Sequence, residues 1–294
     1  IGDGSNSLFA SNFEQYCSFL SKKQVNVILP KTVYSVSANA FKKSSTITTI
    51  NVVNVSNTTT FANQQNANLT ICGVSGSGAE NGAINNRFSD MYSYDKNDTK
   101  KTATIKGFSS AALGILNYLP DGVTVNFEIP TFISSGKYIS TSIADNAFAN
   151  KKFMKTLIIP GTVNSVGVGA FGGCSNINWV KFLGKNTSVS DNAFFEDTID
   201  KIYALSDSKP KEFYTKNHSN GNYGINNASF NTLTLSSIDG VEQNPLKISY
   251  KVGEQLDTTG LVLKTTINDS GNPLTSYVAS GFSCSPTTLN TSGN

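Results

Sequence analysis

The feature that most constrains this chain is a short internal repeat. Residues 157–171 read LIIPGTVNSVGVGAF and residues 27–41 read VILPKTVYSVSANAF, and in both segments a proline precedes a phenylalanine by eleven positions. A fixed pattern of this kind indicates stacked repeats, in which each unit contacts mainly its neighbours. The repeat therefore predicts a chain that folds as a series of stacked coils.

An Ala-Phe pair marks the same point in successive units. The phenylalanines of these pairs are Phe148, Phe171 and Phe194, and both steps equal 23 residues. We interpret each coil as a short strand ended by a proline, a turn, a second short apolar stretch and an Ala-Phe pair that points inward. Burial of one phenylalanine contributes about 1.5–3 kcal/mol, so a ladder of such rings can stabilise coils that are too small to fold alone.

Two segments carry a resemblance to a known repeat family. Residues 158–174 (IIPGTVNSVGVGAFGGC) and 146–160 (NAFANKKFMKTLIIP) resemble the BspA-type, or Treponema-like, leucine-rich repeat. The resemblance implies a mainly β fold, a right-handed leucine-rich-repeat solenoid of short strands and short helical turns. Cys174 falls on the cysteine of the repeat pattern, which implies a buried, unpaired thiol facing the core. The resemblance extends over about 127–214 and returns at 25–41.

Residues 1–233 are predicted to form this solenoid. Its middle, about 47–125, follows the repeat less closely and is interpreted as degenerate coils. Within it, residues 73–101 are predicted to be a loose surface segment, because long loops of this composition are commonly functional or disordered. Seven extra residues between Pro130 and Phe148, relative to the neighbouring coils, predict a further insertion.

The repeat ends near residue 233, and apolar and polar residues then alternate in strand-length segments. Residues 248–278 resemble the bacterial immunoglobulin-like domains of surface proteins, through Tyr-x-Val-Gly-Glu and the Leu-Asp-x-x-Gly-Leu that follows it. The resemblance implies a small immunoglobulin-like β-sandwich over 234–294, in which a last strand is expected to be missing. Residues 269–272 (DSGN) predict a hairpin turn. The implied core positions are Tyr250, Val252, Leu256, Leu261 and Leu263.

The residue types needed for catalysis are sparse, so no catalytic, cofactor-binding or metal-binding residue is predicted. The single histidine, His218, lies in a turn-rich stretch and is predicted to be exposed, and no G-x-S-x-G motif occurs. The glycines of residues 73–78 lack the Lys-Ser/Thr of a phosphate-binding loop. Three acidic pairs have the residue types of a glycosidase, but they are predicted to be solvated surface. These pairs are Glu196 with Asp197, Asp90 with Asp95, and Glu254 with Asp257.

The remaining composition excludes several classes of partner. Cys17, Cys72, Cys174 and Cys284 show no CxxC spacing, which together with a single histidine argues against a zinc site, while a bridge between Cys17 and Cys72 stays open. The net charge of +3 comes from scattered lysines and arginines, so nucleic acid is not expected as a partner. No apolar run reaches the roughly 18 residues of a membrane span, no signal peptide is visible at residues 1–6, and a monomer is expected.

The outward-facing strand positions form the candidate partner-binding surface. If Leu157 and Ile159 point into the core, Ile158 points outward, and the period carries its position to later coils. The resulting strip combines the single tryptophan with lysines and a tyrosine, which are frequent at binding hot spots. The alternative is that Trp179 covers a neighbouring coil or docks the next domain. The outward strip consists of Thr156, Ile158, Trp179, Lys181, Lys201 and Tyr203.

The two resemblances together imply a function. They suggest a bacterial cell-surface or secreted protein that binds an extracellular protein or glycan through the solenoid surface, without enzymatic activity. The alternative is a structural stalk for a functional region outside this segment. A glycan hydrolase is a third class, which the missing catalytic residues disfavour.

Overall fold

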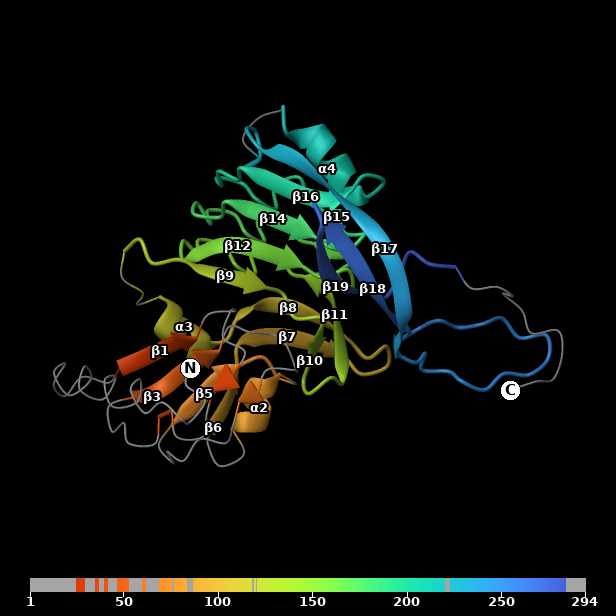
Figure 1. The fold of residues 1–294 in the computed structure, drawn as a ribbon, viewed down its shortest axis with the longest axis horizontal. Coiled ribbons are helices and arrows are strands. Elements are labelled where there is room, and N and C mark those ends of the chain that lie inside the picture. Colours follow the sequence, from red (N-terminus) through yellow and green to blue (C-terminus); the bar gives the residue numbers. More distant parts are fainter. Residues whose placement is uncertain are drawn as a thin grey trace.

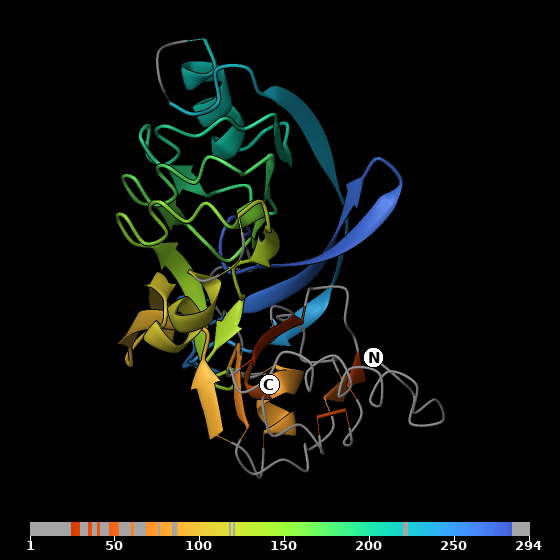
Figure 2. The same ribbon diagram turned by 90° about the vertical axis from the view of Figure 1, so that its left-hand side faces the viewer.

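The computed structural model describes residues 25–29, 35–36, 40–41, 47–52, 60–61, 69–75, 77–83, 87–117, 119, 121–219 and 223–283. Within these ranges the chain is mainly β, most neighbouring strands pair in parallel, and many of them belong to two stacks (Figure 1). Figure 2, turned by 90°, shows the yellow-green to teal coils lying one upon another. This arrangement contains the stacked coils that the repeat predicted, and it is consistent with the leucine-rich-repeat-like fold that the family resemblance implied.

The N-terminal stack is a parallel sheet in the order β1-β3-β5-β6, accompanied by the short pair β2-β4 and by helix α2. Its strands are rich in β-branched residues, which pack well on a pleated surface. Ile50 and Ile71 are paired across β3 and β5, and both are fully buried. The elements are β1 (Val25–Leu29), β2 (Ser35–Val36), β3 (Ile47–Val52), β4 (Thr60–Phe61), β5 (Thr70–Gly73), α2 (Gly78–Gly82) and β6 (Arg87–Asp90).

The second stack follows the repeat, with one register step of 23 residues and a next step of 22 residues. Its parallel strands lie in the order β9-β12-β14-β16-β17, and each register step pairs equivalent residues, such as Leu157 with Val180 and Val180 with Ile202. Pro160 follows the last residue of β12, where a residue without an N–H ends the ladder. The elements are β9 (Val125–Glu128), β12 (Met154–Ile159), β14 (Trp179–Phe182), β16 (Lys201–Leu205) and β17 (Ser229–Gln243).

A second layer closes these coils. It is a sheet in the order β15-β13-β11-β8-β7, with β10 paired to β11, and two helices accompany it. Helix α4 begins after Ser208, whose side chain accepts a hydrogen bond from the N–H of Lys211. The elements are β7 (Tyr92–Asn97), β8 (Thr102–Phe108), α3 (Ser110–Leu116), β10 (Phe132–Ile133), β11 (Tyr138–Ile143), β13 (Ser165–Val166), β15 (Ser188–Val189) and α4 (Lys209–Asn217).

The predicted phenylalanine ladder is confirmed. The rings of Phe148 and Phe171 are stacked with centroids 5.3 Å apart, those of Phe171 and Phe194 with centroids 5.4 Å apart, and all three side chains are fully buried. They belong to one hydrophobic cluster that extends from Cys72 to Ala228. Because the rings repeat at equal intervals, each coil covers the apolar edge that its neighbour would otherwise expose.

Residues 73–101, expected as a loose surface segment, instead contain ordered strands and buried side chains. Strand β6 continues the parallel sheet, and β7 pairs antiparallel with β8 through a turn that includes Lys101 at φ 52°. Met91 and Tyr92 lie in the main hydrophobic cluster. Strand β8, which follows this segment and pairs with β7, shows the alternation that is typical of a strand. Its residues Ala103 and Ile105 are buried between more exposed neighbours.

The insertion predicted between Pro130 and Phe148 is the β10-β11 hairpin. Its turn holds Ser134, Ser135 and Gly136 at positive φ values of 53°, 56° and 79°. A hairpin accommodates extra residues at a coil end because it satisfies its own backbone hydrogen bonds. The stacked register of the neighbouring coils is therefore kept.

The described part of the C-terminal segment continues the last strand of the coils. Strand β17 pairs parallel with β16 up to Leu233 and antiparallel with β18 (Val262–Asp269) from Thr234, and β18 pairs with β19 (Asn272–Val278). Among residues 234–283 these strands form one antiparallel layer, which continues the sheet of the coils without a linker. The domain boundary expected at 233/234 therefore falls inside β17, because the first part of this strand pairs with β16 and the second part pairs with β18.

The hairpin turn expected in this segment is present, but only one of the five implied core residues is buried. The DSGN hairpin turn is confirmed, with Asp269 paired to Asn272 and positive φ at Ser270 and Gly271. Of the implied core residues, Leu261 is buried and Val252 is 60% exposed. The other three, Tyr250, Leu256 and Leu263, are partly buried.

Candidate binding surface

The register of the parallel strands places the outward strip as the period predicted. Thr156 pairs with Trp179 and Trp179 with Lys201, which forms one row across β12, β14 and β16. A second row joins Ile158 and Lys181 in the same way, and ends at Tyr203 in β16. Leu157 and Ile159, the residues between these positions, are fully buried in the core. Alternation along each strand thus sends the six strip residues to the outer face.

A cluster of two aromatic rings and one cation lies at the centre of the strip. The Lys181 ammonium is 5.1 Å from the Trp179 ring centroid and 4.8 Å from that of Tyr203. The two rings meet edge to face, with centroids 5.9 Å apart. A cation over ring faces is attracted by their quadrupoles, so Lys181 holds both aromatic side chains in fixed orientations.

The β18-β19 hairpin covers part of the strip. Lys181 Nζ lies 2.6 Å from Asp269 Oδ2 at the hairpin turn, and only 8% of Lys181 is exposed. Ile158 and Tyr203 pack against a small cluster made by Leu183, Leu233 and Ile267. The second row of the strip therefore faces the hairpin, which corresponds to the docking alternative that the sequence left open.

The first row remains partly accessible. Trp179 is partly buried, Lys201 is exposed, and Thr156 is covered, with its Oγ1 2.9 Å from Oδ1 of the exposed Asn126. Exposed polar side chains, Lys155 and Asn178, lie at the same strand beginnings. The accessible surface thus combines one aromatic plane with amide and ammonium groups, which can hydrogen-bond and stack against a partner.

The β18-β19 hairpin packs closely against the coils at Gly161, which has no side chain. A Cβ on Gly161 would lie 2.6 Å from the carbonyl oxygen of Tyr277 and 2.9 Å from Cγ1 of Val278. Ser280 donates to Oδ1 of Asn164 over 2.6 Å, and the rings of Tyr277 and Phe132 lie 5.7 Å apart. The next coil also carries glycine at the equivalent position, Gly184, whereas the unit at residues 27–41 carries lysine there.

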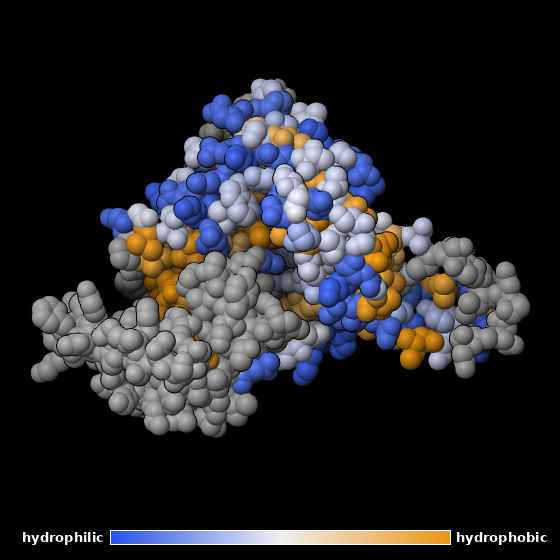
Figure 3. Space-filling model, in the orientation of Figure 1, coloured by the Kyte–Doolittle hydropathy of each residue, from blue (hydrophilic) through white to orange (hydrophobic). Residues whose placement is uncertain are grey.

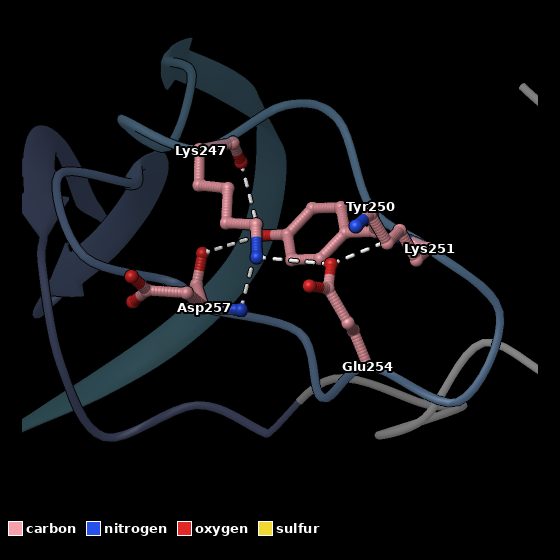
Figure 4. Close-up of polar contacts among 5 residues, drawn as sticks. All are labelled: Lys247, Tyr250, Lys251, Glu254 and Asp257. Atoms are coloured by element: carbon pink, nitrogen blue, oxygen red, sulfur yellow. Dashed lines mark hydrogen bonds and ion pairs between the residues drawn. The ribbon is translucent and has the colours of Figure 1, made fainter.

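The acidic pairs do not form a two-carboxylate site. Glu254 and Asp257 belong to a surface loop organised by the Tyr250 hydroxyl, which donates to the Asp257 carbonyl and accepts from its N–H (Figure 4). Glu254 Oε2 accepts from the N–H of Lys251 and pairs with Lys247 Nζ at 3.0 Å. These bonds tie both acids to their own loop.

The other candidate side chains are also engaged locally. Asp90 accepts from the Tyr94 hydroxyl at 2.8 Å, while Asp95 is exposed and lies 3.4 Å from Lys106. Burial raises the pKa of Asp90 above its usual value. His218 follows α4 and stacks on Tyr214 with centroids 4.7 Å apart.

Asp197 is the acid that departs most from expectation. It was predicted to be solvated, but it is 5% exposed and neither of its carboxyl oxygens has a hydrogen-bond partner among the described residues. Burial raises the pKa of this carboxyl to about 8. The nearby N–H groups of Gly173 and Cys174 donate to the carbonyls of Phe195 and Phe171 instead.

The position of Asp197 in the repeat explains its burial. It follows Phe194 by three residues, as Cys174 follows Phe171. Cys174 is a fully buried free thiol, as the repeat pattern implied, and its Sγ lies 3.0 Å from the carbonyl oxygen of Phe148. Burial raises the pKa of this thiol to about 12. Asp197 therefore occupies an inward position that the preceding coil gives to cysteine.

Further findings bear on cofactors and membranes. Cys72 is also a buried free thiol, whereas Cys17 and Cys284 lie outside the described residues. No group of three or more metal-binding side chains occurs in the part of the chain that the structure describes. Within the same part, no helix is both long and apolar enough to cross a membrane.

Comparison with known proteins agrees with the repeat. The sequence pattern of the BspA type leucine rich repeat region matches in six copies over residues 11–93 and 141–240, more than half of the chain. No curated protein matches. Among solved structures, the chain is similar to a leucine rich cell surface protein from Faecalibacterium prausnitzii A2-165, at 14% identity and a TM-score of 0.29. The match covers 70% of this chain and 58% of that protein.

Proposed function

The chain belongs to the BspA-type leucine-rich repeat family, and from this premise we propose that it is a bacterial cell-surface or secreted protein that binds an extracellular macromolecule. The binding surface is the open part of the outward strip, with Trp179 at its centre. The partner is a protein or a glycan of the host or of the cell envelope. No catalytic step is part of this function.

The observation that carries the proposal is the position of Trp179. The only tryptophan of the chain stands on the outer face of a parallel sheet, beside exposed Lys201 and edge to face with Tyr203. Large aromatic side chains contribute most to affinity when they are held rigidly and can be desolvated by a partner. Lys181 fixes the orientation of the ring, so little entropy is lost on binding.

Binding to a glycan array and to a panel of extracellular-matrix proteins tests this function. For a ligand found in the screen, we expect Trp179→Ala to weaken binding at least about tenfold, since a hot-spot truncation costs about 2 kcal/mol or more. Phe195→Ala is the matched control, because Phe195 is an exposed aromatic residue, 42% accessible, at an Ala-Phe turn rather than on the strip. Circular dichroism should show that both variants fold.

Two results would contradict the proposal. One is unchanged affinity of the Trp179→Ala variant for every ligand that the wild type binds. The other is an equal loss of affinity in the Phe195→Ala variant, which would place the contact outside the outward strip.

A structural stalk is a second candidate, and the docked hairpin favours it. The sheet runs without interruption from β9 to β19, and the hairpin is fixed to the coils through Asp269 and Ser280. A continuous sheet with a docked end is suited to a rigid spacer. This role predicts that no ligand is found in either screen and that Trp179→Ala changes nothing but local packing.

The finer architecture is part of the same proposal. We infer that the two stacks of coils belong to one right-handed solenoid over residues 1–233, and that residues 234–294 are related to bacterial immunoglobulin-like modules. Support comes from the family match, which reaches residue 240, and from the similarity of residues 248–278 to such modules.

A further inference from the structure

The distal half of β17 is an exposed strand with one unpaired edge. Every residue from Thr234 to Glu242 is exposed, and β18 pairs with only one edge of this half. Strand β16 ends its pairing at Leu233, and no other described strand joins β17. The half-strand lies on the right-hand side of the stacked coils in Figure 1, with the loop that follows it further to the right, and hydrophobic surface is visible on this side in Figure 3. A free edge of this kind can pair with another strand.

Three β-bulges give this half-strand an unusual apolar face. The register with β18 shifts after Leu235, Ile238 and Val241, so these residues, three apart in sequence, pair with Ile267, Thr265 and Leu263, two apart. Directly paired residues lie on the same face of an antiparallel sheet. All three side chains therefore share one face, although they are 52%, 61% and 57% exposed.

The spacing of these side chains is symmetric about Ile238. Leu235 precedes it by three residues and Val241 follows it by three. In an antiparallel pair of two identical strands centred on Ile238, Leu235 lies opposite Val241 of the other strand, and Ile238 lies opposite Ile238. We propose that the free edge of β17 binds a second copy of this chain in a two-fold symmetric, antiparallel strand pair, with Ile238 of each copy at the symmetry axis.

Charge in this register is compatible with pairing. Asp239 lies opposite Ser237 of the second copy and Glu242 lies opposite Thr234, so no two carboxylates face each other. Asp239 is already bound on its own side by the hydroxyls of Ser237 and Thr266, at 2.5 and 2.8 Å. A two-fold interface requires a patch that complements itself. The half-strand meets this requirement, because its apolar side chains lie opposite one another and its carboxylates do not.

The interface is small, which sets the expected affinity. Pairing along the nine residues from Thr234 to Glu242 buries less than the roughly 800 Å² per partner of a standard interface, so a reversible dimer in the micromolar range is expected. A dimer of this kind differs from the monomer that the sequence suggested. It does not depend on the ligand-binding role of the outward strip, which lies on other strands.

Disulfide trapping tests the register directly. Cα atoms paired across antiparallel strands lie about 4.5–5.5 Å apart, within the range that a disulfide spans. In a Cys17→Ser, Cys284→Ser background, Ile238→Cys should form a covalent dimer under mild oxidation, whereas Val168→Cys should not. Val168 is a matched control because it is an aliphatic residue, 50% exposed, on a coil turn.

Light scattering over a dilution series tests the native chain. We expect the wild type to pass from monomer to dimer mass as its concentration rises. Ile238→Lys should shift the midpoint at least about tenfold upward, because the symmetry places two ammonium groups face to face, and Val168→Lys should leave it unchanged. Equal melting temperatures would show that the variants fold, as exposed positions allow.

Three outcomes overturn the proposal. They are a monomeric mass of the wild type at the highest soluble concentration, a dimer that Ile238→Lys leaves intact, and cross-linking of Ile238→Cys no faster than that of Val168→Cys. The first would leave the edge free for a strand of another protein, and the second would place the contact between copies elsewhere.

Discussion

Lys181 Nζ lies 2.6 Å from Oδ2 of Asp269, a residue 88 positions later in the chain. The two side chains are 10% and 19% exposed, so the pair is largely removed from water. The pair joins a strand of the coils to the turn of the hairpin. The hairpin that this ion pair fixes covers the second row of the outward strip.

Asp269→Asn should destabilise the protein by about 1.5–3 kcal/mol, because it removes the charge that neutralises a largely buried ammonium. Urea unfolding at neutral pH measures this. Asp207→Asn is the control, since its partner Lys185 and Asp207 itself are 50% and 68% exposed, and surface pairs contribute about 0–1 kcal/mol. Equal effects of the two variants would mean that the hairpin is not held by Lys181.

Gly161→Ala should loosen the hairpin, because the added Cβ would meet a backbone oxygen of β19 that cannot move alone. We expect a loss of about 1–3 kcal/mol, as for other overpacked sites. Faster hydrogen exchange of the β19 amides would locate the effect. Gly114→Ala in α3 is the control, since its Cβ meets nothing within 4 Å and should stabilise the helix by about 0.4–1 kcal/mol. Unchanged exchange in β19 would contradict the docked arrangement.

Phe171→Ala should cost about 3–5 kcal/mol, because Phe171 is fully buried and stacks on a ring from each neighbouring coil. The melting temperature and the urea midpoint measure the loss. Phe195→Ala, one coil further on but exposed, should change stability little. Similar losses from both substitutions would show that the ladder does not hold the coils together.

Stability should fall as the pH rises from about 4 to about 8, through Asp197. The unfolded carboxyl titrates near 3.8 and the folded one near 8, so within this window the folded state holds a proton that the unfolded state has released, and unfolding becomes easier with rising pH. Above about 8 the effect is constant. Its size is on the order of a few kcal/mol.

Urea midpoints measured across this range test the assignment. In Asp197→Asn the downward slope should become shallower, whereas Glu196→Gln, an exposed neighbour, should keep it in full. Asp197→Cys should behave like the asparagine variant over this range, because a thiol at this position would take the place that Cys174 has in the preceding coil. A slope in Asp197→Asn as steep as that of the wild type would assign the proton to another group, such as Asp90, whose pKa is also raised by burial.

The prediction of the coils succeeded because their determinants are local. The step of 23 residues from Phe148 to Phe171 recurs from Phe171 to Phe194, and each unit contacts mainly the next, so one period predicts register, core and outward face together. The position of Trp179 beside Lys201 follows from that period, and the buried thiol of Cys174 follows from the family resemblance. The type of the DSGN turn follows from residues that tolerate positive φ.

What the sequence by itself determined is therefore the coil, its inward ladder and the order of side chains on its outer face, because these depend on residues 2 to 23 positions apart. Only the tertiary structure decided which part of that face stays open. The hairpin that covers Lys181 is placed by contacts between residues such as Asn164 and Ser280, 116 positions apart, and by the missing side chain of Gly161. The contact between Asn164 and Ser280 leaves no periodic signal, because packing between distant segments is selected by shape and charge at single positions.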